Sequence, residues 1–194
     1  LNKIKVKFDI KKIQVYLSTP KPQIIYSGIK IPIKEINLYT KLISILKSKK
    51  EINQITISLE KFSIKNIQKL ATRIKPSNFK NYLLNNFKDG EVEKIFIDLS
   101  LGKNFNIDDY KVNGSIKKIN AKVLNNLFVE DVSLNFISDK NLTLINSLSA
   151  KYQGVLISGG SMSLKREKYI NVEGKFNSQF NMNESEINKL SIKS

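Results

Sequence analysis

The sequence contains no histidine and no cysteine. It therefore lacks the most common general base, and it can form neither disulfides nor thiolate metal sites within these residues. The many serines have no partner base in a recognisable pattern, and the acidic pairs Asp108-Asp109 and Glu130-Asp131 lack the ligand spacing of a calcium loop. Such pairs are typical of solvated turns. We predict no catalytic residue, no metal site and no cofactor, and therefore no enzyme.

Long apolar runs are missing as well. No run approaches the roughly 20 residues of a transmembrane helix, and no signal-peptide pattern is visible. The chain begins with Leu1-Asn2-Lys3, in a segment that already alternates like a strand. We expect residues 1–194 to be a single segment of a longer protein that carries its membrane anchor elsewhere.

Acidic residues are few: 17 stand against 33 basic residues, which gives a formal net charge of +16. One interpretation is a surface for nucleic acid or an anionic membrane. However, only Arg73 and Arg166 are arginines, whereas phosphate- and base-reading surfaces favour arginine forks. Lysine, isoleucine and asparagine make up 81 of the 194 residues, the mark of an AT-rich genome. We favour codon bias and predict no nucleic-acid binding.

Alternation of apolar and polar residues, the period of a half-buried strand, dominates the chain. It is visible at Ile55, Ile57 and Leu59 and again at Ile95 to Leu101. In the C-terminal half, one parity contains Leu142, Leu144, Leu148, Ala150, Tyr152 and Leu156, and a second run contains Ile170, Val172, Gly174, Phe176, Phe180 and Met182. We predict an α+β, mostly β fold, with a long antiparallel meander over residues 91–182 and an apolar concave face.

Helical spacing of apolar residues appears in the N-terminal half. It predicts helices near residues 36–48, 63–74 and 77–88 among the strands of residues 1–90, the last helix being closed by Asp89-Gly90. A short terminal helix is expected over residues 183–194, where Glu186 can complete a capping box with Asn183.

The stretch Gly154 to Leu164, GVLISGGSMSL, raises the question of a phosphate-binding loop. A P-loop requires a lysine after the glycines and a following helix. Here no lysine follows, and alternation resumes at Ser161. We interpret Ser158–Ser161 as a tight hairpin turn, with further turns at Ser138–Asn141 and Arg166–Lys168.

The run IPIKEINLYTKLISILKSKKEINQITISLEKFSIKNIQKL, Ile31 to Leu70, and the run NYLLNNFKDGEVEKIFIDLSL, Asn81 to Leu101, carry a family resemblance. With the meander up to Phe180, they resemble the AsmA-like superfamily of Gram-negative envelope proteins, most closely its YhdP branch. The resemblance implies a periplasmic protein anchored in the inner membrane, with a long β-sheet whose apolar groove carries phospholipid acyl chains between the two membranes.

From the resemblance and the one-sided alternation we predict lipid-groove residues. They are Leu144, Leu148, Tyr152, Leu156, Ile170, Val172, Phe176 and Phe180. The expected partner is phospholipid, with membrane contact through regions outside these residues. Two alternatives stay open: the apolar parity forms an ordinary sealed core, or the chain is a non-transporting envelope scaffold that binds proteins through its sheet edges.

Overall fold

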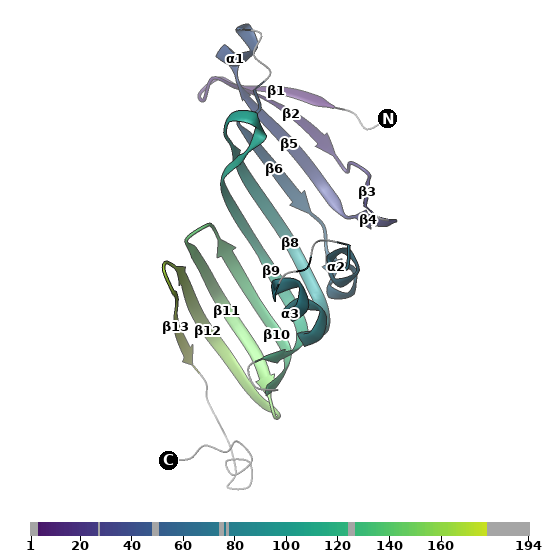
Figure 1. Cartoon of the computed structure of the whole chain (residues 1–194), viewed down its shortest axis with the longest axis vertical. Helices are drawn as coiled ribbons and strands as arrows, with labels where there is room; N and C mark the ends of the chain where they lie inside the picture. Colours follow the sequence, from purple (N-terminus) through teal and green to yellow (C-terminus); the bar gives the residue numbers. More distant parts are fainter. Residues whose placement is uncertain are drawn as a thin grey trace.

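The computed structural model describes residues 4–26, 28–47, 51–73, 76, 78–123 and 127–177. One antiparallel sheet of eleven strands dominates it, in the order β1-β2-β5-β6-β8-β9-β10-β11-β12-β13, with β7 paired to β8 (Figure 1). Its strands are β1 (Lys5–Asp9), β2 (Gln14–Pro20), β5 (Ile33–Lys41), β6 (Gln54–Leu59), β7 (Phe62–Ser63), β8 (Phe87–Leu101), β9 (Ile107–Val123), β10 (Leu127–Ser138), β11 (Leu142–Tyr152), β12 (Val155–Arg166) and β13 (Ile170–Asn177).

The other elements are short. Strands β3 (Ile24–Tyr26) and β4 (Ile29–Ile31) form a separate hairpin between β2 and β5. The helices are α1 (Leu42–Leu46), α2 (Ile64–Ala71), α3 (Asn78–Asn86) and the 3-10 turn η1 (Lys103–Phe105). In the described part of the chain no helix is both long and apolar enough to cross a membrane.

Helix α2 is held by its cap, its apolar face and one side-chain amide. The Ser63 hydroxyl accepts a hydrogen bond from the backbone N–H of Asn66 at 3.3 Å, which satisfies a donor at the helix start. The Gln68 amide donates to the carbonyl oxygens of Leu83, 3.0 Å, and Phe87, 2.7 Å. These bonds tie α2 to α3 and to the first residue of β8.

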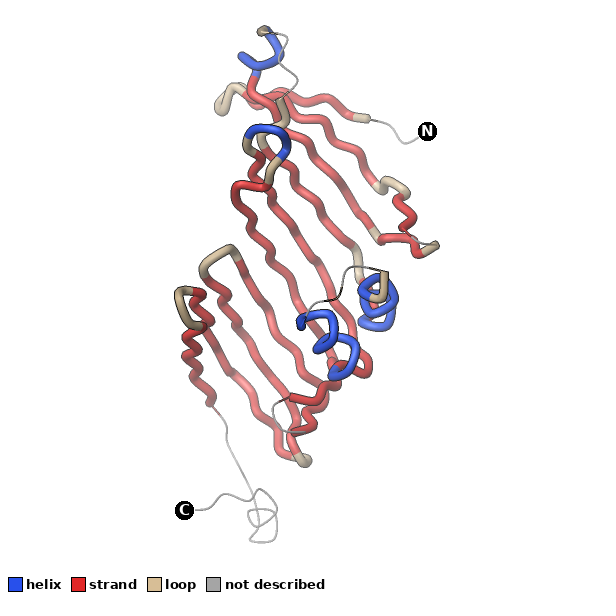
Figure 2. The backbone as a smooth tube through the Cα atoms, viewed as in Figure 1, coloured by secondary structure: helices blue, strands red, loops and turns tan. Residues whose placement is uncertain are grey.

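The main apolar core lies between α2 and the sheet. Its fully buried residues are Ile64, Val92, Ile119 and Ala121. Partly buried side chains of β8, β9 and β10 surround them. Figure 2 shows one layer of strands, with α2 and α3 lying against only a part of it.

The mostly β, antiparallel architecture is confirmed, and β8 to β13 form the predicted meander. Helix α2 lies within the predicted range 63–74 and α3 within 77–88. The predicted helix 183–194 and residues 178–182 lie outside the described residues.

Two local predictions in the N-terminal half are wrong. Residues 36–41 belong to strand β5, and α1 covers only Leu42–Leu46. Because β5 is paired on both sides, to β2 and β6, ladder hydrogen bonds override the local helical spacing. The segment Asp89-Gly90 is not a turn after α3 but lies inside β8, where Gly90 has a φ of 122°.

The predicted hairpin turn at Ser158–Ser161 is also wrong. These residues lie within β12, which runs without interruption from Val155 to Arg166. Gly159 adopts a φ of 69°. Ser158 and Ser161, three positions apart on β12, pair with Asn177 and Lys175, which are only two positions apart on β13. The glycines therefore form a β-bulge, which inserts one residue without reversing the chain.

Candidate functional site

The strand register aligns apolar side chains on one side of the sheet, which we call the apolar face. In an antiparallel pair, residues directly opposite each other point to the same side. One row across the strands joins Val6, Leu17, Leu38, Ile55, Leu99 and Tyr110. A second joins Ile36, Ile57, Ile97, Val112, Ser138, Thr143, Leu164 and Val172. A third joins Phe136, Ile145 and Met162 between Gly114 and Gly174.

The opposite side of the same strands is polar, and its side chains hydrogen-bond to one another. Ser18 donates to Glu35 Oε1 at 2.7 Å. The Asn37 amide donates to Thr56 Oγ1 at 3.2 Å. The Gln54 amide donates to Asp98 at 2.7 and 2.9 Å. In these strands the two sides of the sheet are therefore chemically distinct.

Most of the apolar face is not covered by the described elements. The fully buried residues Val92, Ile119 and Ala121 lie beside α2, whereas Ile57 and Ile97 in the middle of the sheet are only half-buried. Towards the two edges exposure rises, to 56% for Val6 on β1 and for Val172 on β13.

The chain exposes more surface than a compact protein of its mass. Its accessible surface is 14235 Å². A compact monomer of its 22.2 kDa mass exposes about 9,400 Å² by the usual scaling of surface with mass. The structure thus disfavours the sealed-core alternative for the part of the face outside the α2 contact.

A line of β-bulges crosses the C-terminal half of the sheet and preserves the apolar face. Each of five adjacent strands, β8 to β12, contributes one residue with a positive φ to this line: Lys94 (48°), Lys118 (51°), Asp131 (52°), Ser147 (54°) and Gly159 (69°). At each of these positions the strand register shifts, because the strand with the positive φ has one residue more than the stretch of the neighbouring strand that pairs with it. An extra residue reverses the in–out alternation, so apolar residues three apart, such as Ile116 and Ile119, face the same side.

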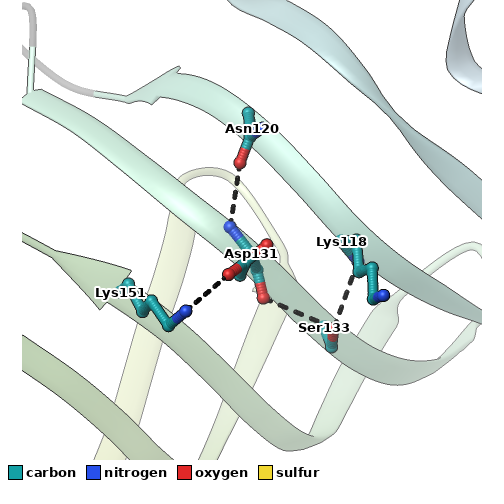
Figure 3. A network of polar contacts seen from close by, with 5 residues as sticks. All are labelled: Lys118, Asn120, Asp131, Ser133 and Lys151. Atoms are coloured by element: carbon teal, nitrogen blue, oxygen red, sulfur yellow. Dashed lines mark hydrogen bonds and ion pairs between the residues drawn. The ribbon is translucent and has the colours of Figure 1, made fainter. Parts of the chain in front are cut away.

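Side chains satisfy the backbone groups that two of these bulges release from the ladder (Figure 3). The N–H of Asp131 donates to Asn120 Oδ1 at 2.9 Å, and the N–H of Lys118 donates to Ser133 Oγ at 3.2 Å. The Lys151 ammonium lies 2.8 Å from Asp131 Oδ2. This hydrogen bond lowers the pKa of the Asp131 carboxyl and raises the pKa of Lys151. These side-chain contacts connect β9, β10 and β11 at the bulges.

The structure divides the predicted groove residues. Leu148, Tyr152, Ile170, Val172 and Phe176 belong to the apolar face. The Phe176 ring lies close to Gly160, opposite Leu148. Phe180 lies outside the described residues.

Leu144 and Leu156 do not belong to this face, which corrects their assignment. Leu144 is opposite Ser163, which in turn is opposite Glu173, on the polar side. Leu156 is opposite Lys151. The Ser147 bulge reverses the alternation between Leu144 and Leu148, and the two-residue turn after Tyr152 reverses it again before Leu156.

The most continuous part of the apolar face was not among the predicted site residues. It comprises Leu38, Ile55, Ile57, Ile97 and Leu99 on the neighbouring strands β5, β6 and β8. Their alternation is visible in the sequence, but which strands lie side by side is not. The bulges do leave a signal in the sequence. Within an otherwise alternating strand, two apolar residues are three positions apart instead of two, as in the pairs Val92 and Ile95 or Ile145 and Leu148.

No group of three or more potential metal ligands occurs among the described residues. The apolar face offers contact area for hydrocarbon. Comparison with known proteins adds no assignment: no protein-family model, no curated protein and no solved structure matches the chain.

Proposed function

We propose that the apolar face binds the acyl chains of phospholipids, and that the chain is a segment of an AsmA-like, YhdP-type lipid transfer protein. In this proposal the protein is anchored in the inner membrane through regions outside these residues. The segment lies in the periplasm, where acyl chains pass along the face between the two membranes. No covalent chemistry is involved.

One observation carries the proposal: overlapping rows of mostly apolar side chains together reach from β1 to β13, interrupted at Ser138 and Thr143, and the central ones are only partly buried. Each methylene that leaves water for such a surface contributes up to about 0.8 kcal/mol. An acyl chain lying across several strands therefore gains binding energy without an enclosed cavity. Monomeric soluble proteins rarely leave large contiguous apolar surfaces open to water.

The test measures binding of a fluorescent phosphatidylethanolamine to the purified chain. Ile57→Asp places a carboxylate among Ile36, Ile55 and Ile97, where facing hydrocarbon is costly. We expect affinity to fall at least about tenfold with an unchanged circular dichroism spectrum, because water can hydrate the carboxylate on an open face. Ser58→Asp, the next residue on the polar side, is the matched control and should bind normally.

Two results would contradict the proposal. One is a folded Ile57→Asp variant that binds the lipid as well as the unmodified chain. The other is an unmodified chain that shows no saturable lipid binding. If Ile57→Asp fails to fold, Ile57→Ser repeats the test without a charge.

The envelope-scaffold alternative rests on a different observation. β1 and β13 are the outer strands of the sheet, and within the described residues each pairs on one side only. Open strand edges are sites where another chain can add a strand.

A further inference from the structure

Strand β13 presents an exposed edge with large apolar side chains. It pairs with β12 on one side, and no described strand covers the other. Ile170 is 68% exposed, Val172 56% and Phe176 50%. An edge of this kind is a template for pairing with another strand unless charges or bulges oppose it. β13 itself contains no residue with a positive φ, so its outer edge is regular.

The sequence of β13 is self-complementary about Gly174. Reading outward from this glycine, Glu173 corresponds to Lys175, Val172 to Phe176 and Asn171 to Asn177. If two copies of β13 pair antiparallel about a two-fold axis at Gly174, each Glu173 is directly opposite the Lys175 of the other copy. Each Val172 is directly opposite a Phe176. Opposite charges and apolar–aromatic pairs are the stabilising cross-strand combinations.

The other edge offers this complementarity only over a shorter stretch. A pairing of β1 with a second β1 that keeps the apolar faces together places Lys5 against Lys7 when it is centred at Val6, and Lys7 against Lys7 when it is centred at Lys7. Centred at Phe8 it sets Lys7 against Asp9 twice, but then only residues 7–9 of each β1 overlap. In a pairing of β1 with β13, each antiparallel register that matches the apolar faces forms at most one pair of opposite charges. The two-fold β13 pairing forms two such pairs without a like-charge contact.

We propose that β13 is a homodimer interface, in which two copies of the chain pair antiparallel through Asn171–Asn177 about a two-fold axis at Gly174. Because directly opposite residues point to the same side, the apolar faces of both copies lie on the same side of one combined sheet. The row that ends at Val172 in one copy continues with Phe176 of the other.

The first test measures the monomer–dimer equilibrium by sedimentation velocity without lipid. Lys175→Glu places glutamate against glutamate twice, and Glu173→Lys places lysine against lysine twice. Each variant should weaken the dimer at least about tenfold. The double variant Glu173→Lys/Lys175→Glu restores both opposite-charge pairs and should dimerise like the unmodified chain.

Lys7→Glu on β1 is the matched control at the other edge and should leave the equilibrium unchanged. A chain that stays monomeric at all accessible concentrations would overturn the proposal. So would single variants that dimerise normally, or a double variant that fails to recover.

The second test uses the absence of cysteine, since one introduced cysteine is the sole thiol. Gly174→Cys lies on the proposed axis, where directly opposite Cα atoms are about 4.5–5.5 Å apart and within disulfide range. The added Cβ would meet a Phe176 ring carbon at 3.1 Å, and this half-exposed ring can move. Mild oxidation should give a disulfide-linked dimer, and adding Lys175→Glu should suppress it.

These outcomes are separable from those of the lipid proposal. Ile57→Asp lies on β6, far from β13 in the strand order, and should not change dimerisation. Loss of the dimer with intact lipid binding rejects this inference alone, whereas an intact dimer without lipid binding rejects the proposed function alone.

Discussion

Replacement of Ile119 and Ile57 by alanine compares the covered and the open parts of the same apolar face. Ile119 lies on β9 and is 2% exposed, in the cluster with Ile64 of α2 and Val92 of β8. Ile57 lies on β6 between Ile36 and Ile97 and is half-buried. The chemical change is identical at the two positions, and both are strand residues, so differences in intrinsic strand preference cancel.

The expected loss of unfolding free energy is about twice as large at Ile119 as at Ile57. Isoleucine to alanine removes three carbon atoms, worth about 2.4 kcal/mol when fully buried at about 0.8 kcal/mol per methylene. At Ile119 the cavity left under α2 adds to this, which brings the loss to about 4 kcal/mol. At Ile57 most of the transfer term applies but water fills the space, so we expect about 1.5–2 kcal/mol.

Urea denaturation followed by circular dichroism measures the loss of unfolding free energy in both variants. The unfolding free energy should depend on urea concentration with the same slope in both, which checks that unfolding is two-state. Similar losses at the two positions would refute the distinction between a covered and an open part. A loss of about 4 kcal/mol at Ile57 in particular would show that this part of the face is sealed.

Two further predictions concern the strand bulges and the acid response. Gly90→Ala should destabilise the chain by at least about 2 kcal/mol in the same assay, because the new Cβ would lie 2.5 Å from Ile119 Cγ1 at a φ of 122°; wild-type stability would contradict this close approach. Hydrogen bonds from the backbone N–H groups of Asn141 and Leu142 lower the pKa of Asp139 in the folded chain. The ionised Asp139 therefore stabilises the fold above about pH 4, and this stabilisation is lost as the pH falls through the lowered pKa of the folded state. The thermal midpoint of Asp139→Asn should consequently fall less between pH 5 and 2 than that of the unmodified chain, and an equal fall would contradict this.

Strand identity and the meander could be predicted from the sequence because alternation is a local signal. Runs such as Ile95, Ile97 and Leu99 appear in β8 as expected. The helix predicted near residues 36–48 is confirmed only as α1, because residues 36–41 belong to β5, whose ladder hydrogen bonds come from segments distant in sequence. Local spacing contains no information about such partners.

The membership of the apolar face was less predictable, since it depends on parity along each strand. A single residue in a left-handed conformation, Ser147, moved Leu144 to the polar side. Its residue type does not favour a positive φ, which is uncommon outside glycine and asparagine. The bulges of adjacent strands form one line, so each is determined by the strands beside it rather than by its own sequence.

Site-specific photocrosslinking shows whether the open apolar face holds acyl chains. A benzophenone amino acid is introduced at Leu38, on the apolar face of β5, and in a second variant at Tyr39, the next residue, which stacks on Tyr16 on the polar side with ring centroids 5.2 Å apart. After irradiation of cells, mass spectrometry of the purified chain detects attached phospholipid. We expect a lipid adduct at position 38 and none at position 39. No adduct at position 38, or equal adducts at both positions, would contradict binding of acyl chains to the apolar face.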